Sequence, residues 1–299
     1  MQKNVEFQNH QVYEINQEDS VIRIAPQFGA RLLDWHVMGK PVIYWPEDAN
    51  WEKVPSVRGG NPILFPFIAR HMVNGEIGWW IDSAGTKRAL PMHGFARNNA
   101  FNVIPETDPS MFRMRFESSP QTREAYPFDF TFDVVYKLGA NSLESRLEVT
   151  NTGNTSLPYY TGHHFYFSVP HDQREKWQVN IPCERHGRQQ PDGSIPETPA
   201  DSDTHALTKP TLSDMFHIGI RSPKISLLEK ETSHGVVIDL DMPGSIPWYA
   251  ITTWVEKTES DFYCVEPWTG LPNAIHHGKG LRHLAPGTKE SAICVIHVK

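Results

Sequence analysis

Short runs of alternating apolar and polar residues constrain the fold of this chain more than any other feature of its sequence. In residues 143–151, LESRLEVTN, the apolar positions Leu143, Leu147 and Val149 are separated by polar and charged residues, so one face suits a core and the other suits water. Successive side chains of a strand point to opposite faces of its sheet, so this pattern predicts β-strands. It recurs in residues 21–26, 112–118, 130–138 and 224–231, and the more apolar residues 291–298 predict a final, central strand.

Proline and glycine separate these runs at short intervals. The 24 Pro and 20 Gly residues fall in turn motifs such as Asn74-Gly75 and Pro243-Gly244. Many short strands joined by such turns are typical of an antiparallel β-sandwich, which can reach this length as one domain. No change in composition marks a linker, so we expect residues 1–299 to form a single all-β domain.

One polar stretch stands apart from this pattern. Residues 185–209 contain no aromatic side chain and should bury little surface, so we expect a long loop on the protein surface. The alternative is that these residues form a rim that closes over a ligand.

Charge and composition exclude several classes of partner. The net charge of −7, from 28 Lys and Arg against 35 Asp and Glu, provides no basic field for a nucleic acid or an acidic membrane. No window approaches the 18 apolar residues of a membrane span, and residues 1–15 lack the apolar segment of a signal peptide. Cys183, Cys264 and Cys294 are odd in number and widely spaced, which favours buried thiols in a reducing compartment. We therefore expect a soluble, cytoplasmic protein whose partner is a small molecule.

The 15 histidines include two adjacent pairs, at residues 163–164 and 276–277. The sequence has no HExxH motif, no HxH followed by a carboxylate and no Cys/His cluster, so we expect neither a metal site nor a cofactor. If residues 163–164 are extended, the two side chains point to opposite faces. Only one of His163 and His164 can then face a pocket.

Other polar residues lie beside apolar runs. Glu266 follows the apolar residues 262–265 and precedes Pro267-Trp268, which places a carboxylate at a strand end beside an aromatic wall. Desolvation there would raise its proton affinity, as suits a general base. The dense segment 57–98 contains Arg70 and the motif His93-Gly94-Phe95-Ala96-Arg97, but a His before Gly is more often a turn residue and Arg97 more often forms a surface ion pair.

Seven segments, in order, resemble the aldose 1-epimerases, or galactose mutarotases. The resemblance covers roughly residues 20–298 and implies two large antiparallel sheets, a supersandwich, with sugar bound in a cleft on a concave sheet. The segments are PILFPFIAR (62–70), PMHGFAR (91–97), YPFDFTFDVVYKL (126–138), LPYYTGHHFYF (157–167), LSDMF (212–216), CVEPWTG (264–270) and LAPGT (284–288).

The resemblance also implies roles for individual residues. Glu266 would be the general base on the anomeric hydroxyl, and His164 the general acid on the ring oxygen. His93 and Arg70 would orient the sugar and stabilise charge near that oxygen. Asp214 would bind a hydroxyl group, with Asp239 and Asp241 as competing candidates. Among the aromatic residues Trp268, Trp79 and Trp80 are candidates to stack on the sugar or to pack in the core.

Anomer exchange requires removal of a proton from O1 and addition of one to the ring oxygen. A carboxylate and an imidazole, expected on opposite sides of the ring, suffice for this chemistry. We therefore expect an aldose 1-epimerase acting on a hexose.

Two alternatives keep the same fold: a hexose-6-phosphate 1-epimerase and a non-catalytic carbohydrate-binding protein. The first is suggested by VRGGNP (57–62), which resembles the RGGxP stretch of that branch, and by the cations Arg58, Lys87, Arg88 and Arg97, which could hold a phosphate. A metal-dependent sugar isomerase of the cupin type is a third reading.

Overall fold

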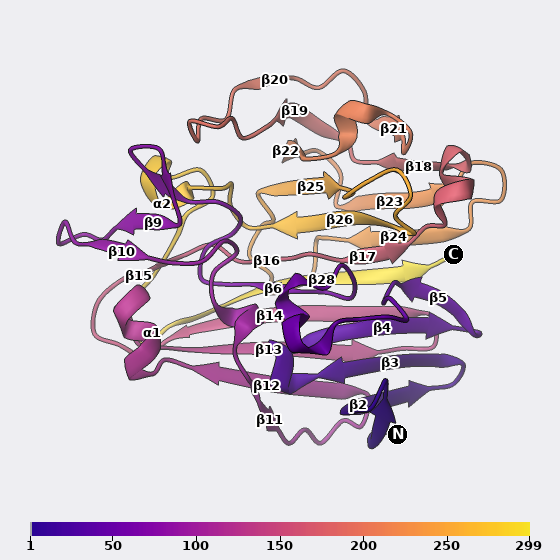
Figure 1. Ribbon diagram of the computed structural model, residues 1–299, viewed down its shortest axis with the longest axis horizontal. Helices are drawn as coiled ribbons and strands as arrows, with labels where there is room; N and C mark the ends of the chain where they lie inside the picture. The colour runs from indigo at the N-terminus through magenta and orange to yellow at the C-terminus, as the bar shows by residue number, and fades with distance from the viewer. Residues whose placement is uncertain (1) are drawn as a thin grey trace.

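Antiparallel β-strands make up most of the computed structural model, which describes residues 2–299. Two large sheets pack against each other, and three two-stranded sheets and short helical turns lie around them (Figure 1). Both ends of the chain lie on the right of this view. The predicted all-β supersandwich is confirmed.

The first sheet has 13 strands among the described residues. Its strands, in spatial order, are β1 (Gln2–Phe7), β2 (His10–Gln17), β3 (Ser20–Ala25), β4 (Arg31–Val37), β5 (Lys40–Ile43), β17 (Tyr166–Ser168), β26 (Phe262–Trp268), β25 (Ala250–Trp254), β22 (Met215–Ile220), β19 (Cys183–Gly187) and β20 (Glu197–Pro199), with β16 (Gly162–His163) beside β26 and β6 (Ile63–Leu64) beside β16.

The second sheet has nine strands within residues 2–299. In spatial order these are β11 (Asn102–Ile104), β12 (Met111–Glu117), β13 (Phe130–Leu138), β14 (Ser142–Asn151), β28 (Lys289–Val298), β24 (Gly235–Asp239), β23 (Lys224–Glu229), β18 (Trp177–Asn180) and β21 (Thr204–Ala206).

The remaining elements are short. The two-stranded sheets pair β7 (Met72–Val73) with β8 (Glu76–Ile77), β9 (Trp79–Ile81) with β10 (Lys87–Ala89), and β15 (Leu157–Tyr159) with β27 (Arg282–Leu284). The helical turns are α1 (Pro120–Ala125), α2 (Ala274–His277), η1 (Pro26–Phe28), η2 (Trp51–Ser56), η3 (Ala96–Asn98), η4 (His171–Lys176) and η5 (Pro210–Leu212).

Every strand predicted from alternation is present. The hairpin of β13 and β14 pairs Phe130 with Asn151 at one end and Leu138 with Leu143 at the other. The predicted final strand is central, because β28 lies between β14 and β24. The apolar side of each run enters one continuous core shared by the two sheets, as shown by Ile22 in β3 and Leu147 in β14, both fully buried. Alternation therefore assigns each face correctly.

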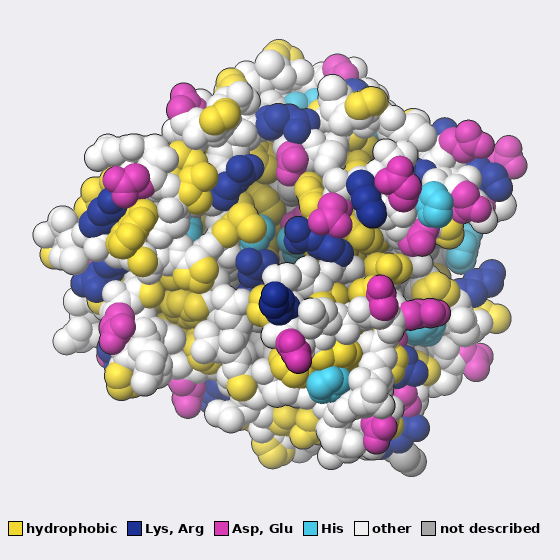
Figure 2. All heavy atoms as spheres, viewed as in Figure 1, with side chains coloured by type: hydrophobic (Ala, Val, Ile, Leu, Met, Phe, Trp, Pro, Cys, Tyr) yellow, Lys and Arg dark blue, Asp and Glu magenta, His cyan; other side chains and the backbone are white. Residues whose placement is uncertain are grey.

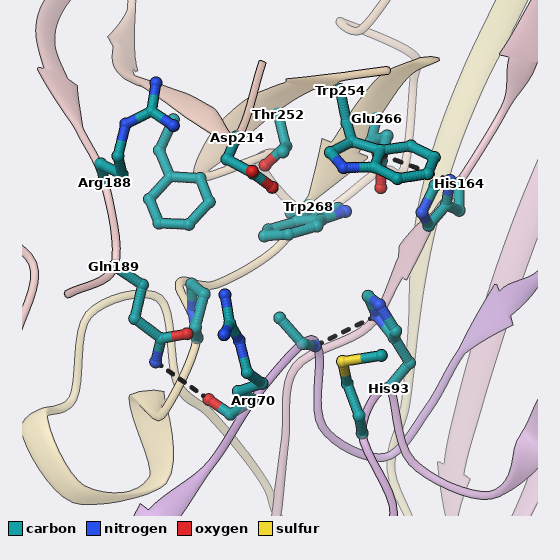
Figure 3. A pocket seen from close by; sticks show the side chains of 14 residues that line it. Arg70, His93, His164, Arg188, Gln189, Asp214, Thr252, Trp254, Glu266 and Trp268 are labelled. Carbon is teal, nitrogen blue, oxygen red and sulfur yellow. Dashed lines mark hydrogen bonds and ion pairs between the residues drawn. The ribbon is translucent and has the colours of Figure 1, made fainter. Parts of the chain in front are cut away.

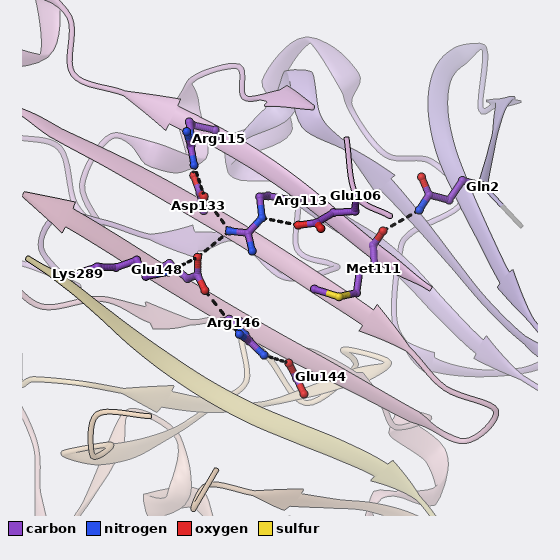
Figure 4. A network of polar contacts seen from close by, with 10 residues as sticks. All are labelled: Gln2, Glu106, Met111, Arg113, Arg115, Asp133, Glu144, Arg146, Glu148 and Lys289. Carbon is purple, nitrogen blue, oxygen red and sulfur yellow. Dashed lines mark hydrogen bonds and ion pairs between the residues drawn. The ribbon is translucent and has the colours of Figure 1, made fainter. Parts of the chain in front are cut away.

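The polar side of the same strands carries a network of ion pairs (Figure 4). Arg113 on β12 lies 2.8 Å from the Asp133 carboxylate on β13 and 2.6 Å from the Glu148 carboxylate on β14. Arg146 on β14 lies near Glu144 and Glu148, at 2.6 Å and 3.7 Å. Adjacent strands thus bring opposite charges side by side, and ion pairs connect the strands across this outer face.

The polar stretch 185–209 differs from its prediction as a loop. It contains the end of β19 and all of β20 and β21, and His205 and Leu207 within it are buried. Backbone pairing replaces aromatic burial here, since β19 pairs with both β20 and β22. The segment between β19 and β20 forms a rim, because Arg188 and Gln189 line the cavity described below.

The prediction that the three cysteines are buried thiols is confirmed, since Cys183, Cys264 and Cys294 are free and buried. No helix within residues 2–299 is both long enough and apolar enough to cross a bilayer.

Candidate active site

The face seen in Figure 2 is hollowed near its centre, with basic side chains around the hollow and histidine inside it. This cavity has a volume of about 400 Å³ and is lined by residues of β22, β25 and β26 and of the connections from β6 to β7, β10 to η3, β16 to β17 and β19 to β20. Figure 3 shows its side chains from close by. Six of the seven predicted site residues line it: Arg70, His93, His164, Asp214, Glu266 and Trp268.

Glu266 forms part of the cavity floor. It lies within β26, opposite Thr252 of β25, and is 1% exposed. The prediction of a strand end was wrong, because Pro267 and Trp268 continue the strand. Burial raises the pKa of Glu266 well above its ordinary value, and the nearby charge of Asp214 raises it further.

His164 stands beside Glu266, with its Nδ1 atom 3.4 Å from Glu266 Oε1 (Figure 3). Its ring stacks on Tyr166 at a centroid distance of 4.8 Å, and its backbone N–H donates to Asn61 Oδ1 at 2.9 Å. Burial lowers the pKa of His164 well below its ordinary value, and neighbouring cations, Arg97 among them, lower it further. The carboxyl of Glu266 thus holds its proton more tightly than usual, and the imidazole of His164 less tightly.

His163 points to the other side of the strand, as predicted. It is fully buried, stacks on Phe165 at 4.6 Å, and places Nδ1 3.0 Å from Asn61 Nδ2. Asn61 therefore positions both histidines: its amide nitrogen contacts the ring of His163, and its amide oxygen accepts from the backbone N–H of His164. The two side chains face opposite sides although His164 lies between strands, since β16 ends at His163 and β17 begins at Tyr166.

His93 is both a turn residue and a cavity residue. Its φ is 66°, and Gly94 follows with φ 74° at a place where a Cβ would overlap the carbonyl oxygen of Phe65. The backbone N–H of Ala69 donates to His93 Nδ1 at 3.2 Å, so a neutral His93 carries its hydrogen on Nε2. Burial lowers the pKa of His93 well below its ordinary value, and Arg97 lowers it further. The neutral ring therefore offers a fixed N–H donor.

Asp214 is the aspartate that reaches the cavity. It has a left-handed backbone, with φ 59°, just before β22. The competing candidates Asp239 and Asp241 do not line the cavity, and Asp239 lies 3.9 Å from Lys224 on the second sheet. Trp268 lines the cavity and donates its indole N–H to the carbonyl oxygen of His163 at 3.3 Å.

The other two tryptophan candidates lie elsewhere. Trp80 is 1% exposed and donates to the carbonyl oxygen of Ala125 at 2.9 Å, so it is a core residue. Trp79 lies under the ammonium group of Lys87 in the β9–β10 hairpin. Neither lines the cavity.

Sequence reasoning missed Thr252, Trp254 and Phe216, which line the cavity from β25 and β22. Phe216 ends the segment LSDMF, whereas no motif marks Thr252 or Trp254, and strand pairing places Thr252 between Phe216 and Glu266. Three buried polar atoms meet here without a hydrogen-bond partner among residues 2–299: Thr252 Oγ1, His164 Nδ1 and Glu266 Oε2. Buried polar atoms are normally paired, so this cluster suits a polar ligand.

Comparison with known proteins agrees with this geometry. The profile described as aldose 1-epimerase matches residues 11–297. The chain belongs to the aldose 1-epimerase family. It is 23% identical over 256 residues to the chromosomal protein LacX of Lactococcus lactis, covering 80% of this chain and 83% of LacX. A Salmonella typhimurium protein named "Putative glucose-6-phosphate 1-epimerase" is 31% identical over 145 residues, 47% of this chain and 43% of that protein.

Among solved structures, the galactose mutarotase related enzyme of Lactobacillus acidophilus superposes with a TM-score of 0.80. Its sequence is 22% identical, and the match covers 96% of this chain and 97% of that one. At this identity the likeness concerns the fold alone.

Arg97, the seventh predicted site residue, does not line the cavity of this aldose 1-epimerase family member. Its Nη2 atom donates to the carbonyl oxygen of Met92 at 3.1 Å, while its Nε atom is buried without a partner within residues 2–299. The phosphate candidates Lys87 and Arg88 are also absent from the cavity lining, and they pair with Glu76 and Asp82.

Proposed function

We propose that this protein is an aldose 1-epimerase that interconverts the α and β anomers of a hexose by acid–base ring opening and closure. The observation that carries the proposal is the buried pair of His164 and Glu266, 3.4 Å apart at the floor of a cavity of sugar size. The family supports a sugar epimerase, and this pair supplies the acid and the base that the reaction needs.

With one proton on the pair, the raised pKa of Glu266 and the lowered pKa of His164 favour that proton on Glu266, and the reactive form is the tautomer in which it lies on His164. In that form ionised Glu266 takes the proton from O1 while protonated His164 gives one to the ring oxygen O5, and the C1–O5 bond breaks to leave an open-chain aldehyde. Rotation about the C1–C2 bond presents the other face of the aldehyde. The reverse transfers close the ring and restore both groups.

We expected Glu266 and His164 on opposite sides of the sugar ring, but they lie side by side, 3.4 Å apart. O1 and O5 are both bonded to C1, so groups that serve these two oxygens must themselves be neighbours. Water excluded from the floor would strengthen both transfers, since charges interact more strongly where solvent is absent.

The surrounding side chains would hold the sugar in register. His93 would donate from Nε2 to the ring oxygen or its neighbour, and Arg70 would stabilise negative charge at the cavity mouth. Asp214 would accept from sugar hydroxyl groups, and the face of Trp268 would pack on the apolar side of the ring. These contacts position the substrate so that the acid and base act on the correct oxygens.

Polarimetry on freshly dissolved α-aldoses tests the proposal directly. We expect the wild-type protein to speed the approach to equilibrium rotation for at least one hexose, with protein boiled before use as the control. A protein that binds sugars calorimetrically but never speeds rotation would instead be the carbohydrate-binding alternative.

A phosphorylated hexose is the second candidate substrate. Three guanidinium groups, those of Arg31, Arg58 and Arg97, act electrostatically on His164. Arg58 and Arg97 do not line the cavity, so they would have to reorient toward it to hold a phosphate. Arg58 already pairs with Glu256 at 2.9 Å, and the net charge of −7 opposes a dianion at long range, so we propose the free hexose first.

Kinetics with glucose and glucose 6-phosphate distinguish the two substrates. If the free hexose is the substrate, kcat/KM for glucose should exceed that for the phosphate ester and change little with salt. A preference for the phosphate ester that salt weakens and that Arg97→Met or Arg58→Met abolishes would establish the phosphorylated substrate instead.

A further inference from the structure

A second cluster of polar side chains lies on the opposite face of the sheet from the cavity. Phe216 of β22 lines the cavity, and the next residue, His217, points the other way and is fully buried. His186 of β19 pairs with His217 across the strands, and Cys183 begins β19. One ligand atom from each of Cys183, His186 and His217 lies within 4.8 Å of the other two.

The hydrogen bonds of His217 leave its Nδ1 free to bind a metal. Thr253 Oγ1 donates to the carbonyl oxygen of Leu212 at 2.7 Å, so it must accept from His217 Nε2–H, 3.1 Å away. The Nδ1 lone pair then faces Cys183 Sγ at 3.8 Å. Tetrahedral zinc, with bond lengths of about 2.3 Å to sulfur and 2.05 Å to nitrogen, places such a pair about 3.6 Å apart.

His186 is oriented in the same manner. Its Nδ1 lies 3.4 Å from Asp201 Oδ1, and its Nε2 is buried with no hydrogen-bond partner among residues 2–299. A carboxylate behind the outer nitrogen of a histidine is the usual support for a metal ligand, because it fixes the ring and leaves the inner lone pair free.

His205 supplies a fourth nitrogen from the other sheet. It lies on β21, is 3% exposed, and its Nε2 has no partner within the described chain. Its ring centroid is 5.3 Å from that of His186 and 5.9 Å from that of His217. On its outer side Lys209 Nζ donates to His205 Nδ1 at 3.2 Å, so the ring carries its hydrogen on Nε2 while this contact is made. To bind a metal through Nε2, His205 must release Lys209, which stays paired with Asp201 at 2.7 Å, and carry its hydrogen on Nδ1.

We propose that Cys183, His186 and His217 form a zinc site, with His205 as its fourth ligand, that fastens the end of the first sheet to β21 of the second. Thiolate and imidazole ligands suit Zn²⁺ and do not suit Ca²⁺ or Mg²⁺, which prefer oxygen. The inference is independent of the sugar chemistry, since these side chains face away from the cavity.

Charge around the cluster is compatible with a bound dication. The nearby carboxylates Asp201 and Asp203 offset the cations Lys209 and Arg221. A metal binds the thiolate form of cysteine, so one proton should be released from Cys183 for each metal bound at neutral pH.

The experiment uses the full-length protein after treatment with a chelator. Zn²⁺ titrated against a chromophoric chelator should bind with a stoichiometry of one per chain, and Co²⁺ in its place should give a thiolate-to-cobalt charge-transfer band with tetrahedral ligand-field bands. Cys183→Ser and His217→Gln should each weaken Zn²⁺ binding by more than about 100-fold. Cys294→Ala, which removes a buried thiol outside the cluster, should leave the affinity unchanged.

Further measurements keep the proposal testable if a ligand variant fails to fold. Thr253→Val keeps the shape of the side chain while removing the acceptor of His217, and should weaken binding about 10- to 100-fold. Calorimetry of the wild-type protein in buffers of different ionisation enthalpy should count one released proton. Absence of stoichiometric binding, or a cobalt spectrum without the thiolate band, would overturn the proposal, and unchanged affinity in His205→Gln would remove His205 from the ligand set.

Discussion

Replacing Glu266 by Gln should lower activity and raise stability at the same time. Gln is nearly the same size as Glu but cannot accept a proton to form a neutral acid. Loss of a positioned general base should lower kcat for anomer exchange by about 100- to 10,000-fold, or about 2.7 to 5.4 kcal/mol in the barrier. The side chain is 1% exposed, so water cannot readily take its place.

The effect on stability follows from the raised pKa of Glu266. In the unfolded chain the carboxyl ionises near its ordinary pKa of 4.5, whereas in the folded protein its pKa lies well above that value because of burial and the charge of Asp214. Between these two values the folded state binds more protons, so the free energy of unfolding falls as the pH rises through that window. The Glu266→Gln variant does not lose this free energy. At pH values above the window it should therefore unfold at a higher temperature than the wild type.

Two assays on the same samples test both parts. Polarimetry gives kcat, and thermal unfolding followed by circular dichroism at a series of pH values gives the difference in Tm. Glu144→Gln, on the outer face of the second sheet, is the matched control and should change neither quantity in this way. The reasoning is refuted if Glu266→Gln keeps activity within tenfold of the wild type, or if its Tm difference from the wild type is the same at all pH values.

Other changes probe the site and the outer face of the second sheet. His164→Ala should lower kcat at least about 100-fold, whereas His163→Ala should mainly lower Tm, since His163 is a buried core side chain on the opposite face; equal losses of kcat would contradict the assignment. The pH profile of kcat/KM should be bell-shaped, falling below the lowered pKa of His164 and above the raised pKa of Glu266, and a profile that only rises through pH 6.5 would contradict a shared proton. Burial alone would raise the pKa of Glu148, but Arg113 lowers it overall, so Arg113→Met should cost about 1–3 kcal/mol at neutral pH in urea unfolding, with the difference from the wild type disappearing as the pH falls through the lowered pKa.

The strands and their faces were predictable because alternation is a local property. Residues 130–138 and 143–151 carry the pattern in full, and β13 and β14 form over them with the expected side buried. The opposite orientations of His163 and His164 follow from the same rule. The polar stretch 185–209 was misjudged because strand pairing through backbone hydrogen bonds leaves no mark on side-chain polarity.

The site residues were predicted from short motifs, and the structure shows which of them line the cavity. Glu266, His164 and His93 line one cavity although they are far apart in sequence, whereas Arg97 does not line it. Thr252 and Trp254 belong to β25, whose place beside β26 no motif reveals. Cys183 and His186 are close in sequence, but His205 and His217 join them only through pairing between strands and sheets.

The sequence by itself determined the all-β character, the buried face of each long strand, and which carboxylate and histidine to examine, because these depend on periods of two residues and on short motifs. Tertiary structure alone decided that Glu266 and His164 lie side by side rather than on opposite sides of a sugar ring. It alone also decided that Cys183, His186, His205 and His217 lie close together on the other face of the sheet. Distances between side chains on different strands depend on register and sheet order. Those are set by the packing of the whole core, to which every strand contributes and which no single segment encodes.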